Sequence, residues 1–267
     1  MILKIDKDGF LINEGKIENI PERILVILKE ILLFVQNELG ANLLSAYIRG
    51  SVSVGRFIDN VSDIDFVVIT KNKPSQQDID NFLKYSLDLD KRHNWVSGFD
   101  LFVCGEEELL NTPGLNKLRV YLKTQSVLMF GQDIVSNFKK YKPGKELSQT
   151  LLSEIDREFN FLNTIFSAPN QDFQYNNQIR GLDFWCIWMS RTVLRFSLYA
   201  SLNQHHSYTN DLVDCYQIVS KIYPEFENDL KQALDWSQAP IKDQIILRAY
   251  FEKVAPKIKS IFKVNNL

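Results

Sequence analysis

Two short stretches decide the fold of this 267-residue chain: YIRGS at 47–51 and DIDF at 63–66, with eleven residues between them. The first stretch ends an apolar run in glycine and serine, and the second begins another run that is rich in β-branched residues. Side chains at i and i+2 of a strand point to the same face of a sheet. We therefore expect Asp63 and Asp65 to stand side by side while Ile64 points into the core.

These residue types suit the binding of phosphate and a metal ion. Gly50 lets the backbone approach a ligand closely, and Ser51 offers a hydroxyl and an N–H group to a phosphate. Two adjacent carboxylates repel each other, and a hard dication relieves that repulsion. Mg²⁺ prefers one or two protein carboxylates and takes its other ligands from substrate phosphates and water. Asp63 and Asp65 are therefore predicted to bind Mg²⁺.

A third carboxylate follows at Asp100, within GFDLF at 98–102. Apolar residues flank it, as expected for a charged residue that faces out of a buried strand. It could complete a site for two metal ions, act as a general base on an acceptor hydroxyl, or do both. The alternative is an aspartate at the end of a strand that caps a neighbouring loop.

Together these elements resemble the nucleotidyltransferase superfamily typified by DNA polymerase β, over about residues 40–104. That family has a Gly-Ser after an apolar strand, a gap of about ten residues, an Asp-x-Asp, and a third acid on a later strand. The resemblance implies a Mg²⁺-dependent transferase with two ions and a nucleoside triphosphate as co-substrate. Arg56 and Ser62, in the loop that follows, are further candidates to contact the nucleotide beside Gly50 and Ser51. A surface loop residue is an equally good interpretation of Arg56.

The pattern of apolar residues differs between the two halves of the chain, which predicts two domains. Residues 1–142 mix short β-branched runs with helical periods and form the expected catalytic domain, whereas residues 145–267 are helical throughout and form the expected substrate-binding domain. The predicted fold is an α+β nucleotidyltransferase domain, with a mixed sheet flanked by helices, followed by an all-α helical bundle. The expected strands are 43–48, 64–70 and 99–104. The expected helices are 22–40, 75–91, 115–129, 146–167, 174–203, 210–222, 225–236 and 242–263, and Pro256 is expected to kink the last one or end it early.

The helical half resembles that of the aminoglycoside adenylyltransferases, especially the streptomycin and spectinomycin group. The similar segments are SDID at 62–65, VLMFG at 127–131, SRTVLR at 190–195 and IYPEF at 222–226. The resemblance implies transfer of AMP from ATP to a hydroxyl of a small molecule such as an aminoglycoside. It also implies that Arg195 reaches the triphosphate.

The chain departs from that group in two places. The family's third acid is glutamate, whereas this chain has Asp100, and a lysine that follows the family's arginine has no clear counterpart. Arg191, one turn before Arg195, is a second candidate for the triphosphate. An arginine on the helix surface, paired with an acid, explains either residue equally well.

A polycationic acceptor needs carboxylates and flat apolar surfaces. Asp183, inside an apolar run close to Trp185 and Trp188, is the candidate residue for substrate binding, because burying a charge needs a reason. A buried ion pair of Asp183 with Arg180 or Arg191 is the alternative, and the tryptophans also fit a core.

Composition limits the other functions. The formal net charge is −2, which argues against a protein that binds a nucleic-acid backbone. Three separated cysteines without a CxxC pair argue against zinc and disulfides and favour a cytoplasmic location. No apolar run is long enough to cross a membrane. Two alternatives stay open: a nucleotidyltransferase acting on a protein or RNA, and a non-catalytic nucleotide-binding protein on the same fold. The sequence does not give the oligomeric state.

Overall fold

The computed structural model describes residues 2–168, 173–175 and 178–266. The chain divides into two compact units. Ile12–Lys140 form one, here called the sheet unit, and Met1–Leu11 with Tyr141–Leu267 form the other, here called the helical unit. The sequence places residues 2–11 with the catalytic half, whereas the structure groups them with the helical half. Backbone hydrogen bonds explain the difference, because the Leu3 N–H donates to the Tyr208 carbonyl at 2.8 Å and the Leu11 N–H to the Tyr141 carbonyl at 2.8 Å.

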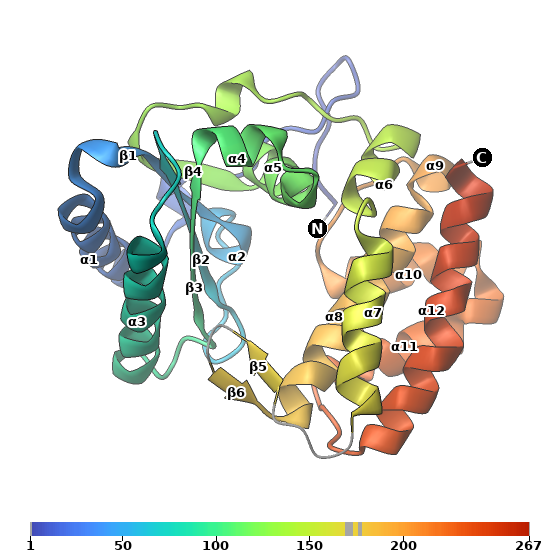
Figure 1. The fold of residues 1–267 in the computed structure, drawn as a ribbon. Coiled ribbons are helices and arrows are strands. Elements are labelled where there is room, and N and C mark those ends of the chain that lie inside the picture. The colour runs from blue at the N-terminus through green and yellow to red at the C-terminus, as the bar shows by residue number, and fades with distance from the viewer. Residues whose placement is uncertain (1, 169–172, 176–177, 267) are drawn as a thin grey trace. The chain divides into compact units, whose positions relative to one another are not determined.

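A four-stranded sheet in the order β3-β2-β1-β4 forms the centre of the sheet unit (Figure 1). β1 is antiparallel to both β2 and β4, whereas β2 and β3 are parallel, so the sheet is mixed as expected. The strands are β1 (Leu43–Arg49), β2 (Ile64–Thr70), β3 (Phe99–Gly105) and β4 (Ser126–Gly131). Every residue of β2 is buried, because β2 is central and covered on both faces.

Helices cover both faces of this sheet, and alternate residues of each strand face opposite layers. On one face, α1 (Glu22–Leu39) and α3 (Gln76–Arg92) pack on Ile48, Phe66 and Leu101. On the other, α4 (Glu106–Asn111) and α5 (Asn116–Thr124) pack on Tyr47, Val67 and Cys104. The unit also contains the single turn α2 (Gly50–Ser53) and the 3-10 helices η1 (Ile17–Asn19), η2 (Gly40–Asn42), η3 (Pro113–Leu115) and η4 (Val135–Asn137).

The fourth strand corrects the predicted helix over 115–129. The chain is helical only as far as Thr124, and β4 follows from Ser126. Its apolar residues are too few to separate a strand from the end of a helix by period alone. Pairing with β1, with Ile48 opposite Val127, decides in favour of a strand.

In the helical unit, α8 (Leu182–Ala200) is the central helix and packs against α10, α11 and α12. The other elements are α6 (Lys145–Leu151), α7 (Ile155–Ser167), β5 (Phe173–Tyr175), β6 (Gln178–Arg180), α9 (Leu202–His205), α10 (Leu212–Ile222), η5 (Pro224–Phe226), α11 (Glu227–Trp236) and α12 (Gln244–Asn266). The antiparallel hairpin β5–β6 is an addition to the expected helical bundle. No helix in the described part of the chain is both long and apolar enough to span a membrane.

Two predicted helices of this unit begin or break elsewhere. The helix expected over 146–167 divides into α6 and α7, and the one expected from residue 174 begins at Leu182, with part of its first turns outside the described residues. α12 continues through Pro256 to Asn266 instead of ending early. Pro256 has no N–H group to donate to the Glu252 carbonyl. Both residues are exposed, so water can donate a hydrogen bond to that carbonyl instead.

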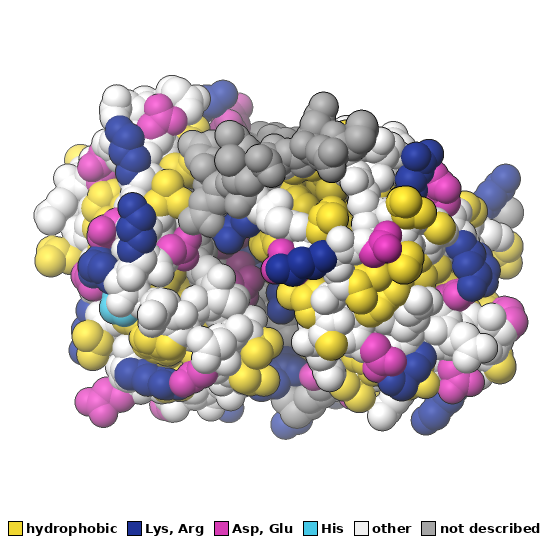
Figure 2. Space-filling model, turned by 90° about the horizontal axis from the view of Figure 1, so that it is seen from below, with side chains coloured by type: hydrophobic (Ala, Val, Ile, Leu, Met, Phe, Trp, Pro, Cys, Tyr) yellow, Lys and Arg dark blue, Asp and Glu magenta, His cyan; other side chains and the backbone are white. Residues whose placement is uncertain are grey.

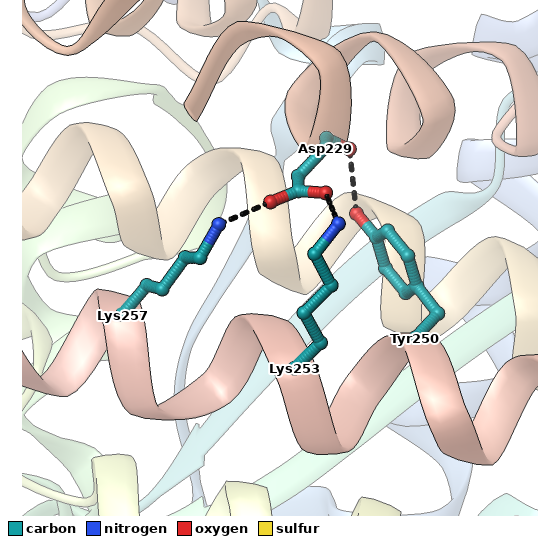
Figure 3. A network of polar contacts seen from close by, with 4 residues as sticks. All are labelled: Asp229, Tyr250, Lys253 and Lys257. Atoms are coloured by element: carbon teal, nitrogen blue, oxygen red, sulfur yellow. Dashed lines mark hydrogen bonds and ion pairs between the residues drawn. The ribbon is translucent and has the colours of Figure 1, made fainter. Parts of the chain in front are cut away.

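A buried carboxylate joins α11 to α12 (Figure 3). Asp229 is 4% exposed, and its two oxygens accept hydrogen bonds from Lys253 at 2.5 Å and Lys257 at 2.6 Å. The Tyr250 hydroxyl donates to the Asp229 backbone carbonyl at 2.7 Å. Burial alone would raise the pKa of the Asp229 carboxyl, but the two lysines outweigh it and lower that pKa below 3.8.

Asp229→Asn should lower the free energy of unfolding of the helical unit by about 1–3 kcal/mol at pH 7, since charge-assisted hydrogen bonds to a buried acid are lost. Because the folded pKa is depressed, this contribution is present above the unfolded pKa and disappears as the pH falls through the folded one. Urea titrations of both proteins, followed by circular dichroism, should therefore differ at pH 7 and converge in strong acid. Equal midpoints at pH 7 would contradict this role.

Candidate active site

One row of side chains crosses the sheet at the end where β1 finishes and β2 and β3 start. Arg49 pairs with Asp65 on β2, and Asp65 pairs with Asp100 on β3. On the other side of β1, Arg49 pairs with Ser126 at the start of β4. Directly paired residues point to the same face of a sheet. The structure therefore brings two predicted site residues, Asp65 and Asp100, together with Arg49, which the sequence analysis did not select.

The Arg49 side chain reaches both carboxylates. One terminal nitrogen of its guanidinium is 2.7 Å from Asp65 Oδ1 and 3.7 Å from Asp100 Oδ2. Its carbon Cζ lies 5.6 Å from the centre of the Tyr121 ring, within the range of a cation–π contact. Asp63 immediately precedes β2 and lies two residues before Asp65. Its charge also acts on Arg49.

The charged side chains of this row shift one another's pKa values. Burial raises the pKa of the Asp100 carboxyl, the Arg49 guanidinium lowers it, and the Asp63 charge raises it further, so that the net shift is upward. Burial would lower the pKa of Arg49, but Asp65, Asp100 and Asp63 together raise it. Arg49 is therefore a permanent cation of this site.

Gly50 follows Arg49 and turns the chain with a φ of +76°. A Cβ atom there would lie 2.4 Å from Asp65 Oδ2, closer than any real contact, and the φ value disfavours other residues too. The Gly50 N–H donates to the Gln125 carbonyl at 3.2 Å. Gly50 thus lets the carboxylate of Asp65 lie directly against the backbone of the turn.

The hydroxyl of Ser51 is buried and has no hydrogen-bond partner in the described structure. Ser53, by contrast, donates to the carbonyls of Gly50 at 2.9 Å and Gln125 at 2.8 Å. An unsatisfied buried hydroxyl beside a glycine turn needs an explanation, and a phosphate oxygen is a suitable partner. This geometry fits the predicted role of Gly50 and Ser51.

The loop between the turn and β2 is held at several points. The Arg56 N–H donates to the Ser51 carbonyl at 2.8 Å, and the Arg56 side-chain Nε is buried without a hydrogen-bond partner in the described structure. Ser62 accepts the Ile58 N–H at 3.0 Å through its hydroxyl. That oxygen therefore supports the loop, whatever else it contacts.

The segment 13–16, before α1, contacts the start of β4 and the turn α2, and no sequence pattern had marked it as part of the site. Asn13 Nδ2 donates to the Ser126 carbonyl at 2.9 Å, and its Oδ1 accepts the Ser126 N–H at 3.2 Å. A Cβ on Gly15 would lie 2.3 Å from the Ser126 carbonyl oxygen, so the backbone passes very close. The Lys16 N–H donates to the Ser53 backbone carbonyl at 3.0 Å. Only the Asn-x-Gly spacing of this segment hinted at a tight turn.

The donor chemistry of the site fits a hard divalent ion. Asp63 and Asp65 supply carboxylate oxygens, and the buried Ser51 hydroxyl lies on the turn where phosphates could provide further ligands. Within the described residues, no group of three or more His, Cys, Asp or Glu side chains is arranged to hold a metal ion. Asp65 and Asp100 are instead directed at Arg49.

The remaining candidates, Asp183 and Arg195, lie in the helical unit. Asp183 is in the first turn of α8, its side chain is 43% exposed, and it pairs with Lys242 at 3.3 Å. The start of the helix is not buried, so the alternative of a buried pair with Arg180 or Arg191 is wrong, and so is the expected burial from which Asp183 was selected. Arg195 Nε donates to the Asn210 carbonyl at 3.3 Å.

No family model matches the chain, and a search of curated proteins finds no match. Solved structures do resemble it. The spectinomycin adenyltransferase AAD(9) from Enterococcus faecialis, solved with ATP and spectinomycin, superposes with a TM-score of 0.61 at 11% identity. The match covers 87% of this chain and 98% of that one. At such identity the likeness establishes the fold, and it confirms the expected nucleotidyltransferase fold followed by a helical region.

Two further structures match a smaller part of the chain. A toxin–antitoxin complex solved with AMP-PNP has a TM-score of 0.31 at 16% identity, over 50% of this chain and 88% of that one. A mutant of the toxin–antitoxin pair MntA-HpeT has a TM-score of 0.30 at 16% identity, over 50% of this chain and 87% of that one.

Gly50→Ala should lower the free energy of unfolding of the sheet unit by about 2 kcal/mol or more, since it combines an unfavourable φ with displacement of Asp65. Gly98→Ala is the matched control, because a Cβ at Gly98 meets nothing within 4 Å. Its effect should stay within about 0.5 kcal/mol. Urea unfolding measures both, and equal effects would show that Gly50 is not constrained by Asp65.

Proposed function

We propose that this protein is a nucleotidyltransferase that depends on a divalent cation and moves AMP from ATP to a hydroxyl group of a small molecule. One observation carries the proposal: Asp65 pairs with Asp100 on the neighbouring strand and lies against Gly50, beside the Ser51 hydroxyl that has no hydrogen-bond partner in the described structure. A site with clustered carboxylates and a free phosphate-binding turn fits phosphoryl chemistry assisted by a metal.

The triphosphate is proposed to bind at the turn, with Ser51 donating its hydroxyl and backbone N–H to the β- and γ-phosphates. Arg56 and Ser62, from the loop that follows, are proposed to contact the nucleotide from the side of β2. Arg56 has a buried Nε without a hydrogen-bond partner in the described structure, which supports a phosphate contact. Arg195, which belongs to the helical unit, is a further proposed contact to the triphosphate, and it rests on the family resemblance alone.

Asp63 and Asp65 are the residues that would hold Mg²⁺, which would neutralise charge on the phosphates and orient them. In the proposed reaction, the acceptor oxygen forms a bond to the α-phosphorus. The bond from that phosphorus to the bridging oxygen breaks, and pyrophosphate leaves with the electron pair. The acceptor's proton passes to the carboxylate of Asp100. Its raised pKa suits it better for this role than an ordinary aspartate.

A small cationic acceptor is proposed on the helical unit, near the start of α8. Asp183 is partly exposed there and offers a carboxylate, and its contacts with Lys242 outweigh burial so that its pKa lies below the ordinary value. Trp188 packs edge-on against Trp185 with ring centres 5.5 Å apart, and Trp188 is only partly buried. The structural likeness to an adenyltransferase solved with spectinomycin extends over 87% of this chain, which supports an acceptor of this class.

The surface gives less support to a nucleic-acid acceptor. Figure 2 shows Lys and Arg side chains interspersed with Asp and Glu side chains over the face drawn, on both units. The formal net charge is −2. Binding of a phosphate backbone depends on a concentration of positive charge, so a small molecule is the preferred acceptor class.

Incubation with α-labelled ATP and Mg²⁺ should transfer label to at least one compound in a panel of aminoglycosides and spectinomycin. Asp63→Asn should reduce the rate by about 100-fold or more, because a ligand to the metal is lost. Asp88→Asn is the matched control, since Asp88 is an exposed carboxylate of the same unit that pairs with Arg92. It should leave the rate unchanged.

The possible outcomes distinguish an error in the proposed acceptor from an error in the proposed reaction. If no compound of the panel is labelled although ATP and Mg²⁺ bind and Asp63→Asn abolishes that binding, the acceptor class is wrong, and protein and RNA acceptors are tested next. If ATP does not bind in the presence of Mg²⁺, the proposed function itself is wrong.

A further inference from the structure

Arg49 is the least expected member of the candidate active site. It is the last residue of β1, its side chain is 19% exposed, and its guanidinium contacts both Asp65 and Asp100. The Tyr121 ring covers it from α5. A positive charge therefore contacts two of the carboxylates that a transferase would use to hold metal ions.

The geometry of Arg49 does not resemble an ion pair optimised for stability. Its Nε is buried without a hydrogen-bond partner in the described structure, and the contact with Asp100 is long, at 3.7 Å. A buried guanidinium loses hydration, so an arrangement that only stabilises the fold would satisfy all of its donors. The arrangement instead places a charge beside carboxylates that are directed at the site.

The net charge of the site also indicates that Arg49 acts as a cation toward the carboxylates. Asp63, Asp65 and Asp100 together carry a charge of −3, and Arg49 reduces it to −2, which one divalent ion neutralises. Without the arginine, the same three carboxylates would attract more positive charge. Mutual repulsion of neighbouring carboxylates is what makes such sites bind cations.

We propose that Arg49 is a resident cation of this centre, which contacts both Asp65 and Asp100 and supplies the positive charge that a second divalent ion would otherwise bring. The protein then holds one divalent ion by itself, at Asp63 and Asp65, and a further ion enters only as part of the nucleotide's own complex. This inference rests on the proposed nucleotidyltransferase function, and it replaces the expected pair of protein-held ions with one ion and one arginine. Arg49 is thus a positioning residue that sets how many metal ions the site accepts.

A purely structural role for Arg49 predicts something different. If Arg49 only joined β1 to β2 and β3, its removal would lower stability and leave metal binding unchanged or weaker. If it competes with a cation, its removal should strengthen metal binding. Metal affinity in the absence of nucleotide therefore distinguishes the two roles.

The test is a titration of the full chain with Mn²⁺, without nucleotide, followed by electron paramagnetic resonance of the free ion. The wild type should bind one Mn²⁺. Arg49→Gln and Arg49→Met, which both remove the charge, should bind a second Mn²⁺ or bind the first about tenfold more tightly. Arg49→Lys, which keeps the charge, should behave like the wild type.

A matched control removes an arginine–carboxylate pair elsewhere in the same unit. Arg92, on α3, pairs with Glu30 at 2.7 Å and Asp88 at 2.7 Å, so Arg92→Met should leave Mn²⁺ binding unchanged. The melting temperature of each variant, measured with and without Mn²⁺, is a second measure of metal binding. Added Mn²⁺ should raise the melting temperature of Arg49→Gln more than that of the wild type, even if the variant is less stable by itself.

Two results would overturn the proposal in different ways. Equal stoichiometry and affinity in the wild type and in folded Arg49→Gln would show that Arg49 does not compete with a cation, while the proposed function would stand. No Mn²⁺ binding by the wild type and both neutral variants, with or without a non-hydrolysable ATP analogue, would remove the proposed function as well.

Discussion

The pairing of the Arg49 guanidinium with the Asp65 carboxylate, 2.7 Å apart, is the interaction on which the site depends. Strand register places Arg49, Asp65 and Asp100 in one row, and Asp63, immediately before β2, adds a charge that acts on both Arg49 and Asp100. Neighbouring carboxylates repel one another, and a nearby positive charge reduces that repulsion. The arginine supplies that charge within the protein itself, so the row can form before any ligand binds.

The surrounding fold serves this row. Gly50 leaves room for the Asp65 carboxylate against the turn, and Ser53 fixes the turn to the Gln125 carbonyl. Asn13 holds the start of β4 from the outside through two hydrogen bonds to Ser126. Rigid positioning of this kind suits the proposed phosphoryl transfer, since such catalysis comes mainly from orientation and neutralisation of charge. The helical unit is stabilised separately, by apolar packing around α8 and by the buried Asp229 between two lysines.

Local sequence patterns predict only part of this arrangement. The period of a strand places Asp63 and Asp65 on one face, and apolar runs identify β1, β2 and β3, because those signals lie within a few residues. The strand at Ser126 was taken for the end of a helix, since a short apolar run acquires its conformation from its partner β1. Arg49 was missed for the same reason: its neighbours Asp65 and Asp100 come from strand pairing, which no local period reveals. The support by Asn13 likewise connects residues 113 positions apart.

This row of carboxylates and arginine is the proposed centre for binding nucleotide and metal. The most direct test of this proposal is a crystal structure of the protein with Mn²⁺ and a non-hydrolysable ATP analogue, with the metal located by anomalous scattering. We expect Mn²⁺ on Asp63 and Asp65, phosphate oxygens at Ser51, and the Arg49 guanidinium still in contact with Asp65 and Asp100. A nucleotide bound away from the Gly50–Ser51 turn, or a Mn²⁺ ion in the place of the Arg49 guanidinium, would contradict the proposal.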